Sequence, residues 1–187
     1  RDGDTSVKSP LATPFVTKDM RKLLRIPYNR PVSKWDCAYS FVSQARANVP
    51  DPLRTILWFG YDNPHTTCYV PIYNGVTDTP ETWRTFDRNA FDLKSTQWAF
   101  ILGDELVNRR YQEAMADLTA VRAPLEKSFF DRIPEVDKKA AELAAADPAK
   151  AKAFLTDFTR ECMEKTEQTW WKLNWQLIST YNNNKGK

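Results

Sequence analysis

The sequence predicts an α+β domain, with antiparallel strands in its first half and long helices in its second half. Three short apolar runs between residues 35 and 75 are joined by short connections rich in turn residues, which is typical of consecutive antiparallel strands. From residue 79 to residue 181, apolar residues recur every three or four positions, which is typical of helices. The 187 residues, 42% of them hydrophobic, are sufficient for one core, so we treat 1–187 as a single unit.

The N-terminal region carries no strong element signal. Residues 1–12 are polar and aperiodic, and we predict a flexible lead-in. Residues 14–33 are basic and interrupted by Pro27 and Pro31, which favours an irregular arm that covers a surface.

Three strands follow the arm. We predict them at residues 37–44, 55–59 and 68–73, because each run is rich in β-branched and aromatic residues. The last run stops at Asn74-Gly75, a tight-turn dipeptide. Pro71 lies inside this run, and proline donates no ladder hydrogen bond, so its strand belongs at an edge of the sheet or at a bulge.

Prolines also mark the predicted helices. Thr79 followed by Pro80 is typical of a helix start, as is Asp147 followed by Pro148. Pro124 is expected to kink or divide the intervening helix, and Pro134 is expected to open a separate alanine-rich helix.

The composition bears on three classes of function: nucleic-acid binding, membrane insertion and metal or cofactor chemistry. A net charge of +3 without a run of like charges gives no indication of nucleic-acid binding, and no apolar stretch is long enough to span a membrane. Three scattered cysteines and one histidine do not form a metal-ligand pattern, so we predict neither a metal nor a cofactor. The compartment stays open between secreted or periplasmic and cytoplasmic.

Two groups of side chains could have a functional role, but for both groups a purely structural role is favoured. His65 and Cys68 could form a catalytic pair, but residues three apart in an extended segment point to opposite faces, and a free cysteine is usually buried. Cys37 and Cys162 receive the same structural interpretation. Trp170, Trp171 and Trp175 could form a stacking platform, whereas core packing is the commoner role of large aromatic residues.

The polar loop from Asp62 to Thr67 is more informative, because it carries amide, hydroxyl and imidazole groups between two apolar strands. Binding sites are commonly built on such loops, and ordinary turns use the same residues. The residues by themselves do not distinguish a binding site from an ordinary turn.

Four segments carry a resemblance to a known family. They are YSFVSQAR at residues 39–46, WFGYDNPHTTCYVPIY at 58–73, FDLKSTQWAF at 91–100 and NRRYQ at 108–112. In order and spacing they resemble the C-terminal portion of the secernin-like cysteine dipeptidases, which belong to the N-terminal-nucleophile hydrolases. The resemblance extends over roughly residues 30 to 180.

The resemblance implies part of an αββα sandwich and hydrolysis of short peptides by a cysteine that is the first residue of the mature enzyme. The free α-amino group of that cysteine would serve as the base, so no catalytic histidine is needed. Residue 1 is arginine here, so we expect the nucleophile in a missing N-terminal half and an inactive isolated chain. The expected partners are that half and a short peptide. Formation of a homo-oligomer is a further possibility, and a bacterial origin is expected.

The resemblance also suggests roles for four residues. Asn63 would donate a hydrogen bond to the oxyanion, Thr67 would shape the substrate pocket, and Arg46 and Gln44 would position the substrate. The alternative function is a non-enzymatic module that binds a protein or a carbohydrate through its tryptophans.

Overall fold

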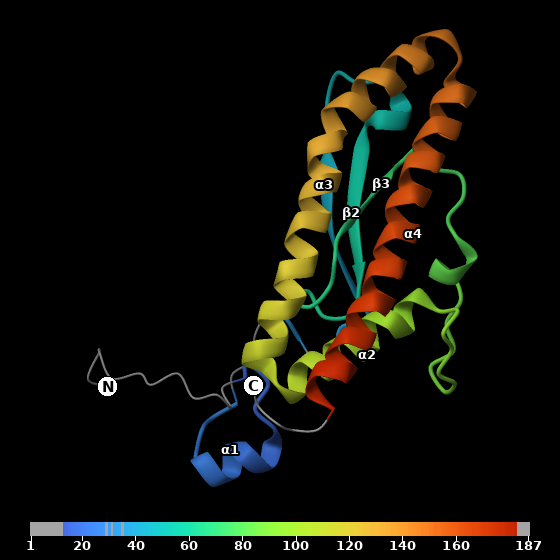
Figure 1. Cartoon of the computed structure of the whole chain (residues 1–187). Coiled ribbons are helices and arrows are strands. Elements are labelled where there is room, and N and C mark those ends of the chain that lie inside the picture. Colours follow the sequence, from blue (N-terminus) through green and yellow to red (C-terminus); the bar gives the residue numbers. More distant parts are fainter. Residues whose placement is uncertain (1–12, 29, 31, 35, 183–187) are drawn as a thin grey trace.

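A three-stranded sheet lies against a layer of helices in the computed structural model, which describes residues 13–28, 30, 32–34 and 36–182 (Figure 1). The flexible lead-in predicted for residues 1–12 lies outside the described residues. In chain order the elements are α1 (Lys18–Leu24), β1 (Tyr39–Ala45), η1 (Asp51–Leu53), β2 (Thr55–Tyr61), β3 (Val70–Tyr73), η2 (Glu81–Trp83), α2 (Thr96–Arg109), α3 (Tyr111–Ala146) and α4 (Pro148–Tyr181). This arrangement confirms the predicted α+β class, with strands in the first half and helices in the second.

The sheet has the order β1-β2-β3, and both pairs of strands are antiparallel. Tyr39 lies opposite Tyr61 at one end of the β1–β2 ladder, and Ala45 lies opposite Thr55 at the other. Pro71 sits in β3, an edge strand of the sheet as described, where its missing N–H is tolerated. The edge placement predicted for Pro71 is therefore confirmed.

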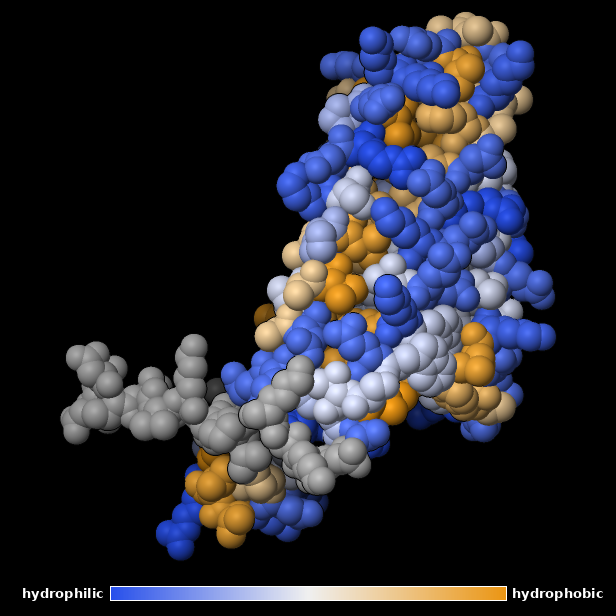
Figure 2. All heavy atoms as spheres, in the orientation of Figure 1, coloured by the Kyte–Doolittle hydropathy of each residue, from blue (hydrophilic) through white to orange (hydrophobic). Residues whose placement is uncertain are grey.

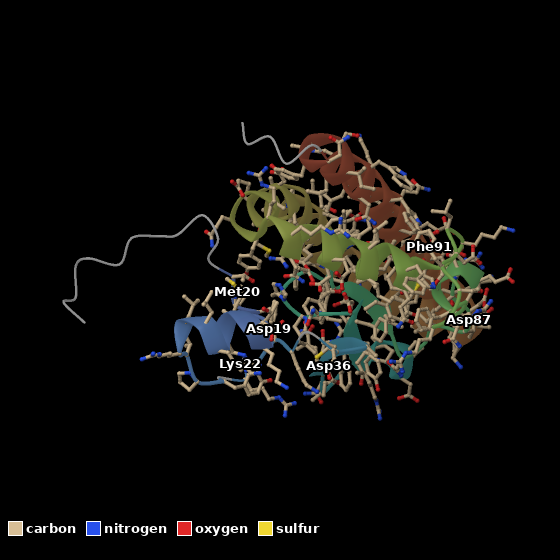
Figure 3. All side chains as sticks on the ribbon, turned by 90° about the horizontal axis from the view of Figure 1, so that it is seen from below. Asp19, Met20, Lys22, Asp36, Asp87 and Phe91 are labelled. Atoms are coloured by element: carbon tan, nitrogen blue, oxygen red, sulfur yellow. The ribbon has the colours of Figure 1, made fainter. Side chains whose placement is uncertain are left out.

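The two faces of the sheet have different surroundings. Ile56 and Trp58 of β2 are buried beneath the helices, and the Trp58 ring stacks on Phe130 of α3 with ring centroids 4.1 Å apart. Seen from below in Figure 3, α2, α3 and α4 lie on one side of the sheet. Tyr39 and Phe41 remain 57% and 55% exposed. Among the described residues, the helices thus cover one face of the sheet only.

The prediction of an irregular arm over residues 14–33 is wrong at α1. The Thr17 hydroxyl accepts a hydrogen bond from the backbone N–H of Met20 at the N-terminus of this helix, and Arg25 ends the helix in the left-handed conformation. Both caps lie before Pro27, so seven helical residues fit between Pro14 and Pro27. Figure 2 shows hydrophobic side chains at the surface of this helix, where Leu23 is 78% exposed.

The predicted helix start at Thr79-Pro80 is also wrong. Pro80 precedes the short turn η2, and the first long helix of this half begins at Thr96. The intervening segment contains turns in which aspartate side chains accept backbone N–H groups, as Asp87 does from Asn89 at 2.8 Å. Such local hydrogen bonds compete with a helix.

Pro124 and Pro134 do not divide α3, which runs continuously from Tyr111 to Ala146. A proline inside a helix costs about 3 kcal/mol, because it removes a hydrogen bond and crowds the preceding turn. Packing of α3 against α4 offsets this cost, since the buried face of α3 continues past both prolines. The helix expected to start at Asp147-Pro148 is confirmed, and the Asp147 carboxylate accepts the backbone N–H of Ala149 at 2.9 Å.

None of the helices in the described part of the chain is long and apolar enough to cross a membrane. The polar face of α3 and α4 is visible in Figure 2 as a hydrophilic surface. The charged residues on it, such as Lys138 and Lys139, are exposed as expected of a solvated helix face.

Gly60 in β2 permits a close approach of the loop that follows the strand. A Cβ atom there would lie 2.3 Å from the Thr67 Oγ1 and 3.1 Å from the backbone oxygen of Cys68. We predict that Gly60→Ala lowers the free energy of unfolding by about 1–3 kcal/mol, measured by urea denaturation of the protein.

A double-mutant cycle tests the cause of this loss. Thr67→Ala removes both side-chain atoms that the new methyl group would meet at short range, so Gly60→Ala should cost less in that background. Equal costs in the two backgrounds would show that the close contact with Thr67 is not the cause.

Candidate functional site

The loop that joins β2 to β3 folds into a closed turn. Asp62 adopts a left-handed conformation with φ 63°, which reverses the chain directly after β2. The backbone N–H groups of Thr66 and Thr67 then both donate to the carbonyl oxygen of Asn63, at 3.1 and 2.9 Å. Asn63, Thr66 and Thr67 are buried as a result.

A buried carboxylate organises this loop. Asp104 projects from α2 and is 5% exposed. It accepts hydrogen bonds from the Asn63 Nδ2 at 3.0 Å, from the Thr66 Oγ1 at 2.7 Å and from the Asn108 Nδ2 at 2.9 Å. A buried charge is stable only when it is well hydrogen-bonded. The three donors meet this requirement, and two of them come from the loop.

His65 lies at the outer edge of the same network. Its Nδ1 is 2.9 Å from the Oγ of Ser33, and its Nε2 is 3.9 Å from the Oδ1 of Asp104. The imidazole ring is flanked by Phe15 and Tyr111, with ring centroids 4.9 and 5.9 Å away. Burial lowers the pKa of His65, although Asp104 opposes the shift. The nearby positive charge of Arg122 also lowers this pKa.

Arg122 attaches the loop to α3. Its Nη1 donates to the backbone oxygen of His65 at 2.5 Å and to that of Thr67 at 3.3 Å. A guanidinium that binds two backbone carbonyls restrains the path of the loop. The loop is thus anchored by both α2 and α3.

Asp62 introduces a group that titrates near neutrality. Its burial, reinforced by the nearby charge of Asp104, raises the pKa of Asp62 to about 7. A carboxyl group with such a pKa can exchange a proton under physiological conditions.

The two buried cysteines, Cys68 and Cys162, are poorly suited to act as nucleophiles. Cys68 is completely buried, and burial raises the pKa of its thiol well above the ordinary value. Cys162 is equally buried, and burial raises the pKa of that thiol to about 12. A thiol that stays protonated is a poor nucleophile, so both cysteines fit the structural interpretation.

The structure does not bring the four suggested site residues together. Asn63 and Thr67 share the loop at the Tyr39 end of β1, where Asp62 donates its N–H to the Ala38 oxygen. Gln44 and Arg46 lie at the other end of this seven-residue strand, about 20 Å away along the sheet.

Both distant residues have structural partners. Arg46 forms an ion pair with Asp137 of α3 and donates to the Leu53 carbonyl oxygen. The Oε1 of Gln44 accepts the indole N–H of Trp58 at 3.4 Å. These contacts connect the sheet to its own core.

Sequence analysis missed several members of the network: Ser33, Asp104, Asn108 and Arg122. Asp104 carried a signal that could have been found. It lies four residues after Phe100 and three before Val107, on the buried stripe of α2, where an apolar residue is expected. An acidic residue on such a stripe indicates a partner brought from elsewhere in the chain. Ser33 and Arg122 carried no comparable signal.

The tryptophans do not form one exposed platform. Trp170 is completely buried and stacks on Phe100, with ring centroids 4.8 Å apart. Trp171 is half-buried and stacks on Trp175, which is 49% exposed. The core role expected for this cluster holds for Trp170, and the alternative binding module retains only the Trp171–Trp175 pair.

Within residues 13–28, 30, 32–34 and 36–182, no three His, Cys, Asp or Glu side chains are grouped so that they could hold a metal ion. The loop and the residues that contact it supply amides, hydroxyls, an imidazole, a guanidinium and two carboxyl groups.

Comparison with known proteins assigns the sequence to a family. The sequence model of Peptidase family C69 matches residues 10–123, which is more than half of the chain. The chain belongs to Peptidase family C69. The matched region contains the sheet, the loop, Asp104, Asn108 and Arg122.

A curated relative agrees with the family match. The chain is 28% identical over 141 residues to a protein described as a probable dipeptidase from Latilactobacillus sakei. The alignment covers 75% of this chain and 28% of that protein. The chain thus spans less than a third of the length of this relative.

We predict that Asp62 makes stability depend on pH. Its pKa lies near 7 in the folded state and near 3.8 in the unfolded state, so the folded state binds more protons between these values. The free energy of unfolding should therefore decrease as the pH rises from 4 to 7. Asp62→Asn should remove this decrease, which is on the order of a few kcal/mol, in urea unfolding at pH 4, 5.5 and 8.

Asparagine tolerates the left-handed conformation of Asp62, so the backbone need not change. Glu142→Gln, at an exposed position of α3, is the matched acid-to-amide control and should follow the native protein. A constant offset of Asp62→Asn at every pH would contradict the assignment.

We also predict that the cysteines differ in reactivity. In the folded protein a mild alkylating agent should modify Cys37, which is partly exposed, and leave Cys68 and Cys162 unmodified. Mass spectrometry of tryptic peptides after a short exposure measures this, with labelling in 6 M guanidinium as the control for all three sites. Rapid labelling of Cys68 in the folded protein would restore it as a candidate nucleophile.

Proposed function

We propose that this chain forms part of the catalytic domain of a dipeptidase that hydrolyses short peptides. Membership of Peptidase family C69 supports the hydrolysis of peptide bonds, and the relative described as a probable dipeptidase supports a short substrate. The observation that carries the proposal is the buried Asn63 loop, which Asp104 and Arg122 hold in one conformation. A preorganised polar loop of this kind is what stabilisation of a transition state requires.

The nucleophile in this proposal is an N-terminal cysteine in a part of the protein outside this sequence. Two of the three cysteines described here are completely buried with raised thiol pKa values. The alignment with the probable dipeptidase covers 28% of that protein, so most of its length has no counterpart here. Both observations favour a nucleophile from elsewhere in the enzyme.

The uncovered face of the sheet supports an αββα sandwich. Phe41 lies directly opposite Phe59 on this face, and Tyr39 stacks on Phe59 with ring centroids 5.8 Å apart. Leu57 points the same way, because it alternates with the buried Ile56 and Trp58. A sheet face this apolar needs a second layer, and another sheet would complete the sandwich.

The proposed chemistry proceeds through an acyl-enzyme. The free α-amino group takes the thiol proton, and the thiolate sulfur attacks the carbonyl carbon, whose π electrons move onto the oxygen. Collapse of this tetrahedral intermediate expels the amine, which takes the proton from the α-ammonium group. Water then adds to the thioester and gives a proton to the α-amino group, and the thiolate leaves as the acid is released.

Asn63 is proposed to donate a hydrogen bond to the oxyanion from its side-chain amide. Asp104 accepts the same Nδ2 group at 3.0 Å and thereby fixes the orientation of the amide. Thr67 shapes the wall beside it, and its hydroxyl lies against Gly60. We propose no role for Gln44 and Arg46 at the oxyanion, because they lie at the opposite end of β1.

We predict that Asn63→Ala in the full-length enzyme lowers kcat/KM for dipeptides by about 10²- to 10³-fold, chiefly through kcat. The reason is that a lost oxyanion donor raises the barrier by about 2.7–4 kcal/mol. Steady-state hydrolysis of a set of dipeptides, with detection of the released amine, measures the effect and also tests for dipeptidase activity itself.

Thr66→Val is the matched control, because it also removes a hydrogen bond to Asp104 but no proposed oxyanion donor. It should reduce thermal stability as Asn63→Ala does, while kcat changes by less than about fivefold. Equal losses of kcat in the two variants would mean that Asn63 acts only by supporting Asp104. Absence of hydrolysis by the native enzyme on every dipeptide would overturn the proposed function.

A further inference from the structure

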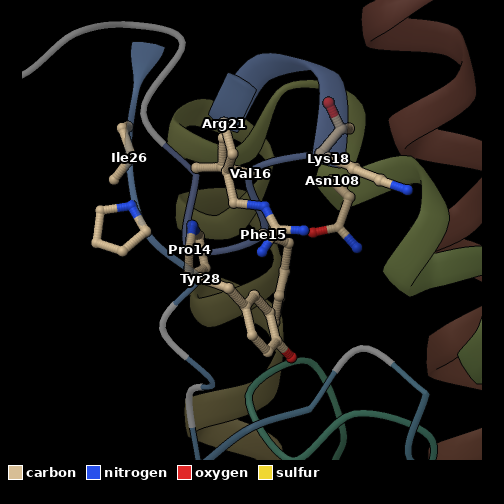
Figure 4. Close-up of a pocket in the computed structure, with 10 residues that line it drawn as sticks. Pro14, Phe15, Val16, Lys18, Arg21, Ile26, Tyr28 and Asn108 are labelled. Carbon is tan, nitrogen blue, oxygen red and sulfur yellow. The ribbon is translucent and has the colours of Figure 1, made fainter. Parts of the chain in front are cut away.

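A cavity of about 490 Å³ lies between the N-terminal arm and the C-terminal end of α2. Its walls are mainly apolar and include Phe15, Ile26, Pro27 and Tyr28 (Figure 4). Asn108 contributes the wall on the side of α2. Ligand sites are typically cavities of roughly 300–1,000 Å³ that combine apolar walls with a few convergent polar groups. This cavity has that character.

The charged groups that line the cavity are cationic, and none of its lining residues is acidic. Arg21 of α1 lies over the Tyr28 ring, with its Cζ 4.5 Å from the ring centroid. Its Nε is buried without a hydrogen-bond partner, and no carboxylate of the described residues lies within ion-pair distance of its guanidinium. Lys18 adds a second positive charge to the lining. An anionic group is therefore the complementary occupant.

The cavity adjoins the Asn63 loop through two shared residues. Asn108 lines the cavity and donates its Nδ2 to Asp104, the carboxylate that also accepts the amide of Asn63. Phe15 lines the cavity and packs on the imidazole of His65. A molecule held here would lie beside the candidate site.

Besides its hydrogen bond to Asp104, Asn108 offers a hydrogen-bond acceptor to the cavity. Its Oδ1 is buried and has no hydrogen-bond partner. Figure 4 shows the Arg21 and Asn108 side chains projecting into the same cavity. A buried carbonyl oxygen left unpaired is unfavourable, and a ligand N–H group would satisfy it.

We propose that this cavity binds the C-terminal residue of a short peptide, with its free carboxylate on Arg21. The apolar walls receive the side chain of that residue, and the Oδ1 of Asn108 accepts the peptide N–H. This inference rests on the proposed dipeptidase function, to which it adds a preference for an apolar C-terminal residue with a free carboxylate.

Binding without hydrolysis tests the cavity directly. N-acetyl-leucine and N-acetyl-leucine amide differ only in the terminal group, which is an anionic carboxylate in the acid and an uncharged carboxamide in the amide. Neither compound is a dipeptide substrate. In calorimetric titrations of the full-length protein, we expect the acid to bind about 10- to 100-fold more tightly than the amide. Arg21→Gln should abolish this difference, and Arg21→Lys should retain part of it.

Lys22→Gln is the matched control, because it removes the same charge from the same helix at an exposed position outside the cavity (Figure 3). It should keep the native preference for the acid. Equal binding of acid and amide by the native protein, or equal losses in Arg21→Gln and Lys22→Gln, would overturn the proposal.

Hydrolysis separates this proposal from the proposed function. For alanyl-leucine, Arg21→Gln should raise KM by about tenfold or more and change kcat less, while alanyl-leucine amide should be unaffected. If Arg21→Gln cleaved both substrates with the KM of the native enzyme, the cavity assignment would be overturned and the dipeptidase function would stand. Selective binding of the acid without cleavage of any dipeptide would overturn the dipeptidase function and leave the cavity as a site for apolar carboxylates.

Discussion

The buried carboxylate of Asp104 is the group on which the candidate site depends. It is a charge inside a predominantly apolar helix face, and its stability requires the hydrogen bonds from Asn63, Thr66 and Asn108. Removing a partner from such a group leaves an uncompensated charge, which is among the most destabilising changes a core can undergo. The loop after β2 therefore has one favourable position, and the amide of Asn63 has one orientation.

Arg122 and Gly60 complete this arrangement. Arg122 of α3 binds two backbone carbonyls of the loop, and Gly60 of β2 allows the buried Thr67 to lie against the sheet. Long helices packed in pairs are stiff supports, because their side chains interdigitate at crystal-like density. A polar loop is thus held by rigid elements, which is how sites acquire a defined geometry. On the face of the sheet opposite the helices, Tyr39 and Phe41 remain exposed.

Three predictions about helices were wrong for two different reasons. At α1 and at Thr79-Pro80 the local signals were ambiguous, since capping residues and proline occur both at helix starts and in turns. In α3 the local signal was clear, because prolines disfavour a helix interior. It was outweighed by packing against α4 over the whole length of the helix, a tertiary contribution that no local window contains.

The sequence by itself determined the α+β class, the positions of the three strands, the edge placement of Pro71 and the polar loop containing Asn63. These features follow from local patterns of apolar, turn and proline residues, which act over a few positions. Only the tertiary structure decided which residues meet that loop. Asp104 and Arg122 reach it from helices 41 and 57 positions along the chain from their hydrogen-bond partners, whereas Arg46, near in sequence, is removed to the opposite end of β1. An extended strand separates neighbours in sequence, and helix packing brings distant residues together, so a site of this kind is defined by the three-dimensional contacts.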